Sequence, residues 1–236
     1  MTVTFLGAKQ RVAAGAKTHK CAASAQQIRL ADKSAARIPS DLPLLTQPQM
    51  KILGISGSLR KGSYNTALLR AAVSLMPDGA QLEAASIHGI PLYDGDLEAA
   101  QGIPPAVQDL KDKVVAADGL LLVTPEYNNG IPGPFKNAID WLSRPSADIA
   151  RVFGDRPVGV IGASPGGFGT ILAQNGWLPV LRTLGTRAWF GGRLQVSRAG
   201  NIFNPDGDLT DEAIRAQLRK YLAGFVDFIR NRAPGG

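Results

Sequence analysis

The chain of 236 residues is 44% hydrophobic, so it can bury one sizeable core, and its formal net charge at pH 7 is +7. Residues 1–49 hold seven Lys or Arg and two Asp, so they contribute +5 of this charge and the rest of the chain only +2. Because the positive charge is concentrated in this N-terminal segment, nucleic acid is not an expected partner of the folded part. No apolar run reaches the roughly 18 residues of a membrane span, and none has the length of a secretory signal.

Residues 1–49 are rich in Ala, Ser, Gln and Lys and show neither helical nor strand periodicity, so we expect a largely disordered basic leader. Four origins are open: a transit-type targeting peptide, a basic tail that contacts anionic surfaces, translated sequence upstream of the functional start, and a leader added for expression. Met50 stands immediately before the first predicted strand, which favours the upstream-sequence explanation.

Cysteine and histidine are scarce in this sequence. The single cysteine, Cys21, lies in the leader, so disulfides and thiol redox chemistry are excluded from the predicted domain, and we expect a cytoplasmic protein. The two histidines, His19 and His88, and the absence of clustered carboxylates give a protein-bound metal little support. We expect His88 to lie in a surface loop.

The predicted elements alternate along the chain between buried strands and amphipathic helices. A strand over 51–56 precedes a helix over 65–75 and a second strand over 81–87, after which residues 90–105 form an irregular connection. The later elements are a helix over 106–117, a strand over 119–124, a helix over 135–144, a strand over 156–163, a helix over 171–184, a strand over 186–190 and a helix over 209–229. Gly176 and Pro179 mark a point where the helix over 171–184 could break, and residues 194–196 could continue the strand over 186–190.

Five strands that alternate with five helices predict an α/β fold with a doubly wound parallel sheet and helices on both faces. The flavodoxin-like strand order is 2-1-3-4-5, and ligands of such sheets bind beyond the carboxyl ends of the strands where the order reverses. Three loops rich in Gly, Pro, Ser and Asn follow strands 1, 3 and 4, which are neighbours in this order. One ligand could therefore contact all three loops.

The first of these loops, within the sequence KILGISGSLRKGSYN of residues 51–65, has the composition of a phosphate site at the start of a helix. A Walker loop needs Lys directly after its second glycine, whereas Gly62 is followed by Ser63, so a nucleoside triphosphate is not expected. The three spaced glycines of the dinucleotide fingerprint are also missing after Gly57. The remaining chemistry suits a terminal monophosphate held by hydroxyls, one amide, backbone N–H groups and the charges of Arg60 and Lys61. A capped strand-to-helix turn without a ligand is the alternative.

The second and third loops suit the ring of a flavin mononucleotide. Residues 126–129 offer backbone amides, two carboxamides and an aromatic ring, which fit the polar edge and flat face of an isoalloxazine. Residues 164–167, Ser-Pro-Gly-Gly, offer N–H groups without bulk, so that a ring can lie close to the backbone. A polar turn with Tyr127 as a surface aromatic, and a plain glycine turn, are the alternatives.

Three motifs resemble one known family. SGSLRKGSYN, TPEYNNGIPGPFKNAIDWLSR and ASPGG are similar to the NAD(P)H-dependent FMN reductases of flavodoxin-like fold, a group that includes quinone, chromate and azo-dye reductases. The resemblance covers residues 50–231, leaves the leader unmatched, and is weak over 169–174. It implies one FMN-binding reductase domain over residues 50–232 and a homodimer or homotetramer with the flavin near a subunit interface. The FMN-binding residues that we predict are Ser58, Leu59, Arg60, Lys61, Gly62, Ser63, Tyr64, Asn65, Pro125, Glu126, Tyr127, Asn128, Asn129, Ser164, Pro165, Gly166 and Gly167.

The function that we expect is transfer of electrons from NADH or NADPH through bound FMN to small acceptors such as quinones, chromate, azo dyes or free flavin. The flavin carries the chemistry, so we assign no catalytic side chain, and Tyr127 is a candidate to stack on a ring or to gate access. The alternative function is that of a flavodoxin-type FMN carrier that acts on protein partners. Such carriers dock through acidic surfaces, which a domain at +2 does not resemble.

Overall fold

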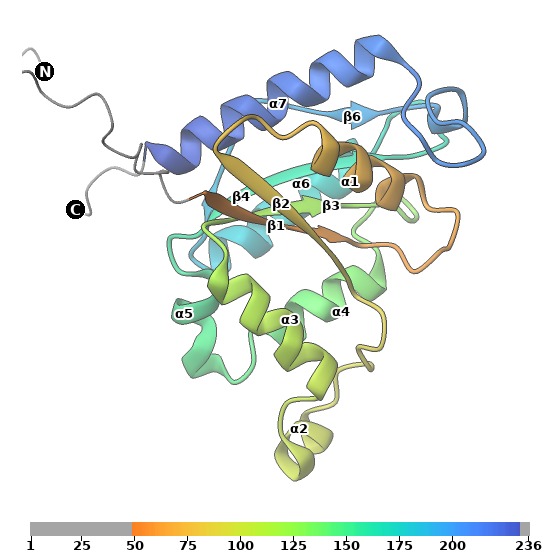
Figure 1. Cartoon of the computed structure of the whole chain (residues 1–236). Helices are drawn as coiled ribbons and strands as arrows, with labels where there is room; N and C mark the ends of the chain where they lie inside the picture. Colours follow the sequence, from red (N-terminus) through yellow and green to blue (C-terminus); the bar gives the residue numbers. More distant parts are fainter. Residues whose placement is uncertain (1–48, 232–236) are drawn as a thin grey trace, which may run out of the picture. The chain divides into compact units, whose positions relative to one another are not determined.

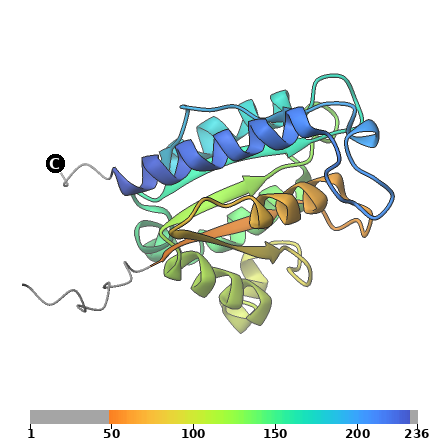
Figure 2. The same cartoon turned by 45° about the horizontal axis from the view of Figure 1, so that its top comes forward.

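The computed structural model of the chain describes residues 49–231, so the predicted leader lies outside the described residues apart from its last position. The described residues form a parallel sheet with helices on both faces (Figures 1 and 2). Its strands are β1 (Met50–Ser56), β2 (Ala80–Ser86), β3 (Gly119–Val123), β4 (Pro157–Ala163), β5 (Arg187–Ala188) and β6 (Gln195–Val196). Their order is β2-β1-β3-β4-β5, with β6 paired to β4, which confirms the predicted flavodoxin-like order.

The strand β3 is the centre of the sheet. Leu121 stands opposite Gly54 of β1 on one side and Gly159 of β4 on the other. All five residues of β3 are buried, because helices cover both faces of the strand. The uniformly apolar run at this point of the sequence is therefore a central parallel strand, as predicted.

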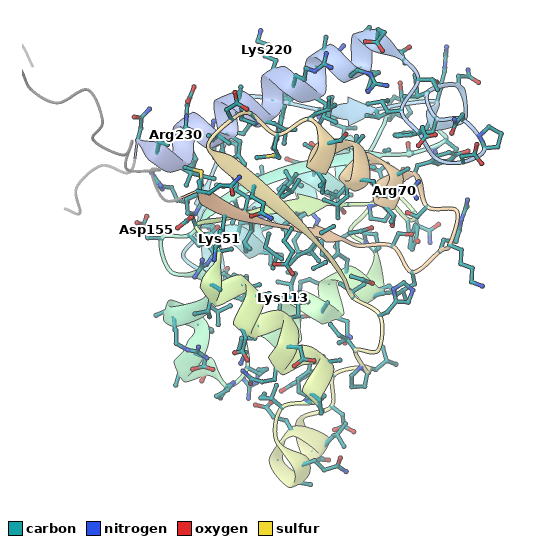
Figure 3. The ribbon with its side chains drawn as sticks, in the orientation of Figure 1. Lys51, Arg70, Lys113, Asp155, Lys220 and Arg230 are labelled. Atoms are coloured by element: carbon teal, nitrogen blue, oxygen red, sulfur yellow. The ribbon has the colours of Figure 1, made fainter. Side chains whose placement is uncertain are left out.

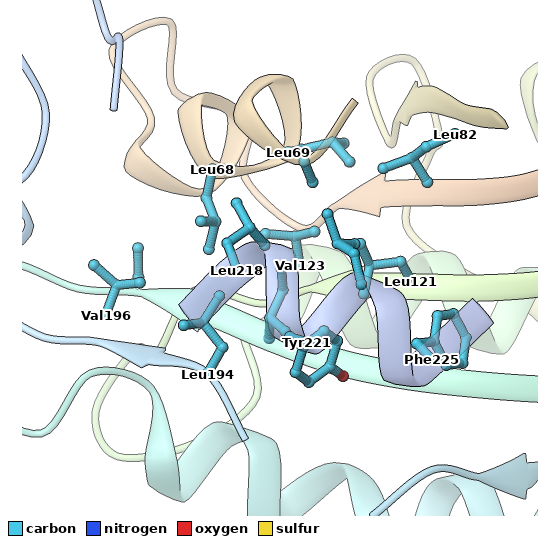
Figure 4. Packing of buried hydrophobic residues seen from close by; sticks show 14 of the residues in the cluster. Leu68, Leu69, Leu82, Leu121, Val123, Leu194, Val196, Leu218, Tyr221 and Phe225 are labelled. Atoms are coloured by element: carbon cyan, nitrogen blue, oxygen red, sulfur yellow. The ribbon is translucent and has the colours of Figure 1, made fainter. Parts of the chain in front are cut away.

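Side chains alternate along the strands between two hydrophobic layers. Leu121 and Val123 face the layer formed by α1 (Tyr64–Ser74) and α7 (Glu212–Arg230). Figure 4 shows this layer, in which Leu68 of α1 and Phe225 of α7 pack over the sheet. Leu120 and Leu122 face the opposite layer, formed by α3 (Pro105–Ala116), α4 (Gly133–Leu142), α5 (Ile149–Phe153) and α6 (Ile171–Thr183).

Helix starts follow the expected capping chemistry. Ser63 caps α1 by accepting from the N–H of Thr66, and Asp211 caps α7 by accepting from the N–H of Ile214. Pro105 opens α3 at a position where a missing N–H costs nothing. None of the helices within residues 49–231 is long and apolar enough to cross a bilayer.

Two glycines of β4 bring helices and loops close to the sheet. A Cβ on Gly159 would lie 2.8 Å from the hydroxyl of Tyr221 on α7. A Cβ on Gly162 would overlap the side chain of Thr170 and the carbonyl oxygen of Thr124. These two glycines therefore permit close packing against β4.

Some expectations for the helices were wrong. Residues 90–105 are not irregular throughout, because they contain α2 (Gly95–Gln101), which Asp94 caps by accepting from the N–H of Asp96. The short helix α5 follows the 3-10 turn η1 (Ser146–Asp148), so the described residues contain seven α-helices and not five. Helix α6 runs unbroken past Pro179, since the buried side chains of Trp177 and Leu181 anchor it on both sides of the proline.

The fifth strand also differs from the expectation. It comprises only Arg187–Ala188, and the chain then leaves β4 and returns as β6, which pairs with Gly162 and Ala163. Between these two pairings the hydroxyl of Tyr221 donates to the carbonyl oxygen of Val160 at 3.2 Å. A buried side chain thus takes the place of part of an edge strand. The turn η2 (Ala199–Asn201) follows β6.

Candidate functional site

The three predicted loops meet at the carboxyl edge of the sheet. They comprise residues 57–63 after β1, 124–132 after β3 and 164–170 after β4, and these strands are adjacent. Hydrogen bonds continue from the sheet into the loops: Gly57 donates to Val123 O at 3.0 Å, and Thr124 donates to Ile161 O at 2.8 Å. The three loops therefore start from fixed and neighbouring positions.

The first loop presents cations at the N-terminus of α1. Arg60 and Lys61 are exposed, and the Nη2 atom of Arg60 donates to Gly62 O at 2.9 Å. Ser58 and Ser63 are buried, with Ser58 Oγ accepting from Arg60 N at 3.3 Å and Ser63 Oγ accepting from Thr66 N at 3.2 Å. The free amides of the first helical turn and the two cations together favour an anion.

The side chain of Asn65 is hydrogen-bonded within the protein, and it joins the first loop to the third. Its Nδ2 atom donates to Ala163 O, and its Oδ1 atom accepts from Ala163 N, both at 2.9 Å. The side chain is buried, so this pair of bonds fixes the first turn of α1 against the end of β4. Asn65 thereby holds the position at which Ser164 begins the third loop.

The second loop carries a tight turn at its tip. Tyr127 and Gly130 exchange backbone hydrogen bonds at 3.2 and 3.0 Å, and Asn128 and Asn129 between them have φ angles of 50° and 60°. This geometry is that of a type I′ turn, for which Asn is a favoured residue. The side chains of Asn128 and Asn129 have no hydrogen-bond partner among residues 49–231 and are exposed, as is Tyr127 at 48%. Pro125 at the base of the loop is buried.

Glu126 is the one predicted residue of the second loop whose side chain is engaged. Its Oε2 atom accepts from the N–H groups of Leu172 at 2.8 Å and Ala173 at 2.9 Å. The carboxylate therefore satisfies two free amides in the first turn of α6.

Backbone hydrogen bonds join the third loop to β6 and to the residues that follow it. Ser164 N donates to Val196 O at 2.9 Å, Ala199 N donates to Ser164 O at 3.0 Å, and Arg198 N donates to Gly166 O at 2.9 Å. Arg198 has a positive φ of 49°, which is uncommon for a residue other than glycine. Pro165, Gly166 and Gly167 remain exposed, so a flat ligand can approach their backbone.

Two hollows flank the first loop. One, of about 320 Å³, lies beside β2 and is bordered by Ser58, Arg60 and His88. The other, of about 410 Å³, lies between α1 and the segment after η2. Arg70 of α1, which Figure 3 labels, donates there to the carbonyl oxygens of Asp206 and Gly207 at 3.1 and 3.2 Å. His88 is exposed, as expected, and its imidazole contacts Ser86 Oγ and Leu59 O.

The structure thus brings all three predicted segments to one edge, while the individual ligand roles of their residues stay predictions. The contacts of Arg198 and Ala199 with the third loop were not anticipated. No signal in the sequence marks them, because they arise from the return of the chain beside β4. No group of three or more potential metal ligands occurs within residues 49–231.

The donor set fits FMN. The cations and free helical amides of the first loop suit a phosphate, the unpartnered carboxamides of Asn128 and Asn129 suit polar ring atoms, and the exposed glycines leave room for a flat ring. The side chains of Ser63, Asn65 and Glu126, in contrast, are already bound to backbone groups.

Comparison with known proteins supports the same assignment. The family model described as NADPH-dependent FMN reductase matches residues 50–200. An NAD(P)H-dependent FMN reductase of Pseudomonas aeruginosa is 42% identical over 181 residues, which cover 77% of this chain and 96% of the relative. An NAD(P)H:quinone oxidoreductase of Solanum tuberosum is 38% identical over 187 residues, covering 76% of this chain and 92% of the relative.

A solved structure is also similar. The flavoenzyme NAD(P)H:(acceptor) oxidoreductase of Paracoccus denitrificans superimposes with a TM-score of 0.69 at 34% identity, over 77% of this chain and 97% of that protein. The expected oxidoreductase class, FMN as cofactor and NAD(P)H as co-substrate are confirmed by these relatives. The chain belongs to the NADPH-dependent FMN reductase family.

Proposed function

We propose that this protein reduces small electron acceptors, quinones first among them, with NADH or NADPH through FMN held by the three loops. The observation that carries the proposal is the convergence of three loops of different chemistry on adjacent strand ends. Quinones come first because relatives from a plant and from Escherichia coli bear the name of quinone oxidoreductase or quinone reductase. Chromate, azo dyes and free flavin are further candidate acceptors.

Each loop has a distinct task in this proposal. Arg60, Lys61 and the amides at the start of α1 hold the phosphate. The turn 127–130 supplies carboxamides to the polar edge of the ring, and the glycines of 164–167 lie against its face. When bound, FMN supplies the hydride-transfer chemistry, so the protein's contribution is orientation and access. In this proposal the exposed Tyr127 stacks on a ring or limits access to it.

A spectroscopic experiment tests the function. The purified full chain should show flavin absorbance, lose it when NADPH or NADH is added without oxygen, and regain it when a benzoquinone follows. The quinone is reduced to the hydroquinone by one hydride equivalent that originates from the nicotinamide and one proton from water. Bleaching that requires a separate reductase protein would instead identify a flavodoxin-type carrier, and a colourless protein that takes up no FMN would overturn both functions.

The oligomeric state and location form a second part of the proposal. We infer a homodimer or homotetramer, because exposed apolar side chains gather at the start of α6 and nearby, with Phe168 at 78% and Phe190 at 71% exposure. Light scattering after gel filtration tests it, and a monomer at micromolar concentration would contradict it. We also propose a cytoplasmic location, since no cysteine occurs after Cys21; cell fractionation tests this.

A further inference from the structure

The N-terminus of α6 is stabilised by a side chain from a different loop. Its N-cap residue, Thr170, accepts through its side chain from Gln174 Nε2 and not from a backbone N–H of the first turn, and the first turn contains no acidic residue. Glu126, which is 46 positions before Leu172, supplies the missing acceptor through Oε2. A carboxylate at this point is favoured both by the free amides and by the helix dipole, so the contact is charge-assisted.

This contact ties together two of the loops that would hold the flavin. Glu126 directly precedes the turn that begins at Tyr127, and α6 begins directly after the loop of residues 164–170. Deeper in the protein, Trp177 Nε1 donates to Thr124 Oγ1 at 3.1 Å. Beyond Glu126 the tips of both loops are exposed, and within residues 49–231 no hydrogen bond joins them. Glu126 therefore provides a second hydrogen-bonded link between the second loop and α6, in addition to that of Thr124 and to the apolar contact of Ile131 beside Gly176.

The same contact removes a competing anion site. Without the Glu126 carboxylate, the first turn of α6 would offer free amides close to the flavin loops. With it, those amides are satisfied and a negative charge lies in front of them. The phosphate of a ligand is left with the N-terminus of α1, where Arg60 and Lys61 are exposed.

We propose that Glu126 is a positioning residue, which sets the spacing between the turn 127–130 and the start of α6 and so the slot for the flavin ring. The proposal rests on the proposed function, because the spacing acts on a flavin held by these loops. Glu126 acts through the backbone amides that it binds and not through a bond to the ring.

Three variants of the full chain test the role. Glu126→Gln keeps an oxygen that can accept from the same amides, so FMN affinity should stay within about threefold of the unaltered chain. Glu126→Ala removes the link and should weaken FMN binding by about tenfold, with a changed flavin absorbance envelope. Glu126→Ala/Leu172→Glu places a carboxylate in the first turn of α6 at a side chain that is 43% exposed. Relative to Glu126→Ala, this double variant should regain melting temperature but not FMN affinity.

The readouts are FMN titration of the apoprotein, the flavin spectrum and amide hydrogen exchange in the absence of flavin. Exchange should rise at residues 126–130 and 171–173 in Glu126→Ala and stay low in Glu126→Gln. The proposal would be overturned if Glu126→Ala had the same FMN affinity and flavin spectrum as the unaltered chain. It would also be overturned if the added Leu172→Glu restored FMN affinity, because Glu126 would then act only as a helix cap. Failure of the unaltered chain to bind FMN is a separate result, and it overturns the proposed function itself.

Discussion

Arg60 and Ser63 belong to the same predicted phosphate loop, yet only one of them supports the fold. Arg60 is exposed, whereas Ser63 is buried and caps α1. Loss of a serine cap costs about 1 kcal/mol, and loss of an exposed hydrogen bond costs little. We expect Arg60→Ala to weaken FMN binding about tenfold with unchanged stability, and Ser63→Ala to weaken it while lowering the free energy of unfolding by about 1 kcal/mol.

The measurement is FMN titration beside urea unfolding of the apoprotein. Lys113→Ala is the matched control, because Lys113 is an exposed cation on α3 that pairs with Glu83 at 2.7 Å. This variant should bind FMN normally. A double variant Arg60→Ala/Ser63→Ala that keeps stoichiometric FMN would show that the loop holds another ligand.

Asn65 tests how strongly the first and third loops depend on each other. Asn65→Ala leaves the N–H and carbonyl of Ala163 without their side-chain partner in a buried place. Each unsatisfied group costs about 1–3 kcal/mol, so we expect the free energy of unfolding to fall by about 2–4 kcal/mol. Urea unfolding measures the loss. Asn175→Ala, at an exposed position of α6, is the control and should stay within about 0.5 kcal/mol; similar losses in both variants would contradict this role.

These residues show where inference from sequence stops. The composition of the three loops identified the segments that meet at the edge of the sheet, because glycine, proline and asparagine mark such loops locally. The composition did not distinguish side chains that are available to a ligand from those that are already hydrogen-bonded within the protein. Asn65 is 98 positions from Ala163, and Glu126 is 46 from Leu172, so their partners are fixed only by the tertiary fold.

At the scale of elements, the end of β1 is matched to the start of α4. A Cβ on Gly57 would overlap the ring of Phe135, which is fully buried and lies edge-on to Trp177 at 5.0 Å between ring centroids. The first loop can leave β1 at this point only because residue 57 has no side chain. The packing of α4 against the sheet thus requires glycine at position 57, next to the predicted phosphate site.

Gly57→Ala should therefore lower the free energy of unfolding by about 1–3 kcal/mol, the usual cost of overpacking. Gly133→Ala is the matched control, since nothing lies within 4 Å of a Cβ there and the residue opens α4. This control should be neutral or slightly stabilising. Thermal unfolding of both variants makes the comparison. A Gly57→Ala protein as stable as the control would mean that Phe135 can move aside freely.

Elements with a strong period were predicted well, and elements that depend on neighbours were not. The first four strands and the long helices α1, α3, α4, α6 and α7 follow from apolar spacing in the sequence, whereas the fifth strand is shorter than predicted. Helix α2 has no buried residue, so apolar spacing could not reveal it, although Asp94 was present as a cap. Strand β5 is short, and the carbonyl oxygen of Val160 beyond it accepts from the hydroxyl of Tyr221, a residue 61 positions away.

At the scale of the whole described fold, one helical layer depends on carboxylates. Glu98 in the first turn of α2 accepts from Arg144 Nε at 2.8 Å and from the hydroxyl of Tyr93 at 2.9 Å. Asp148 accepts from the buried Lys111 at 3.2 Å and from Arg151 Nη2 at 3.0 Å. Both groups join connections around α3 and α4, in addition to the apolar contacts that hold this layer as they hold the layer of α1 and α7.

These contacts predict acid sensitivity. The hydrogen bond from Arg144 lowers the pKa of Glu98, and the bonds from Arg151 and then Lys111 lower the pKa of Asp148. Because both folded-state pKa values lie below the unfolded ones, about 4.3 for Glu and 3.9 for Asp, the stabilisation is complete above them. It is lost as the pH falls through the lower, folded-state values. The urea midpoint should therefore decline as the pH falls below about 4.3.

The variant Glu98→Gln measures how much of this decline in the urea midpoint is due to the carboxylate of Glu98. It keeps an oxygen that can accept from Arg144 but cannot titrate, so its urea midpoint should fall less steeply with decreasing pH than that of the unaltered chain. Glu212→Gln is the matched control, because Glu212 pairs with Arg215 on the surface of α7 at 2.9 Å and its side chain is 77% exposed. The control should show the slope of the unaltered chain, since exposed pairs contribute little. Equal slopes in all three proteins would place the acid sensitivity outside the contacts of α2 with Arg144.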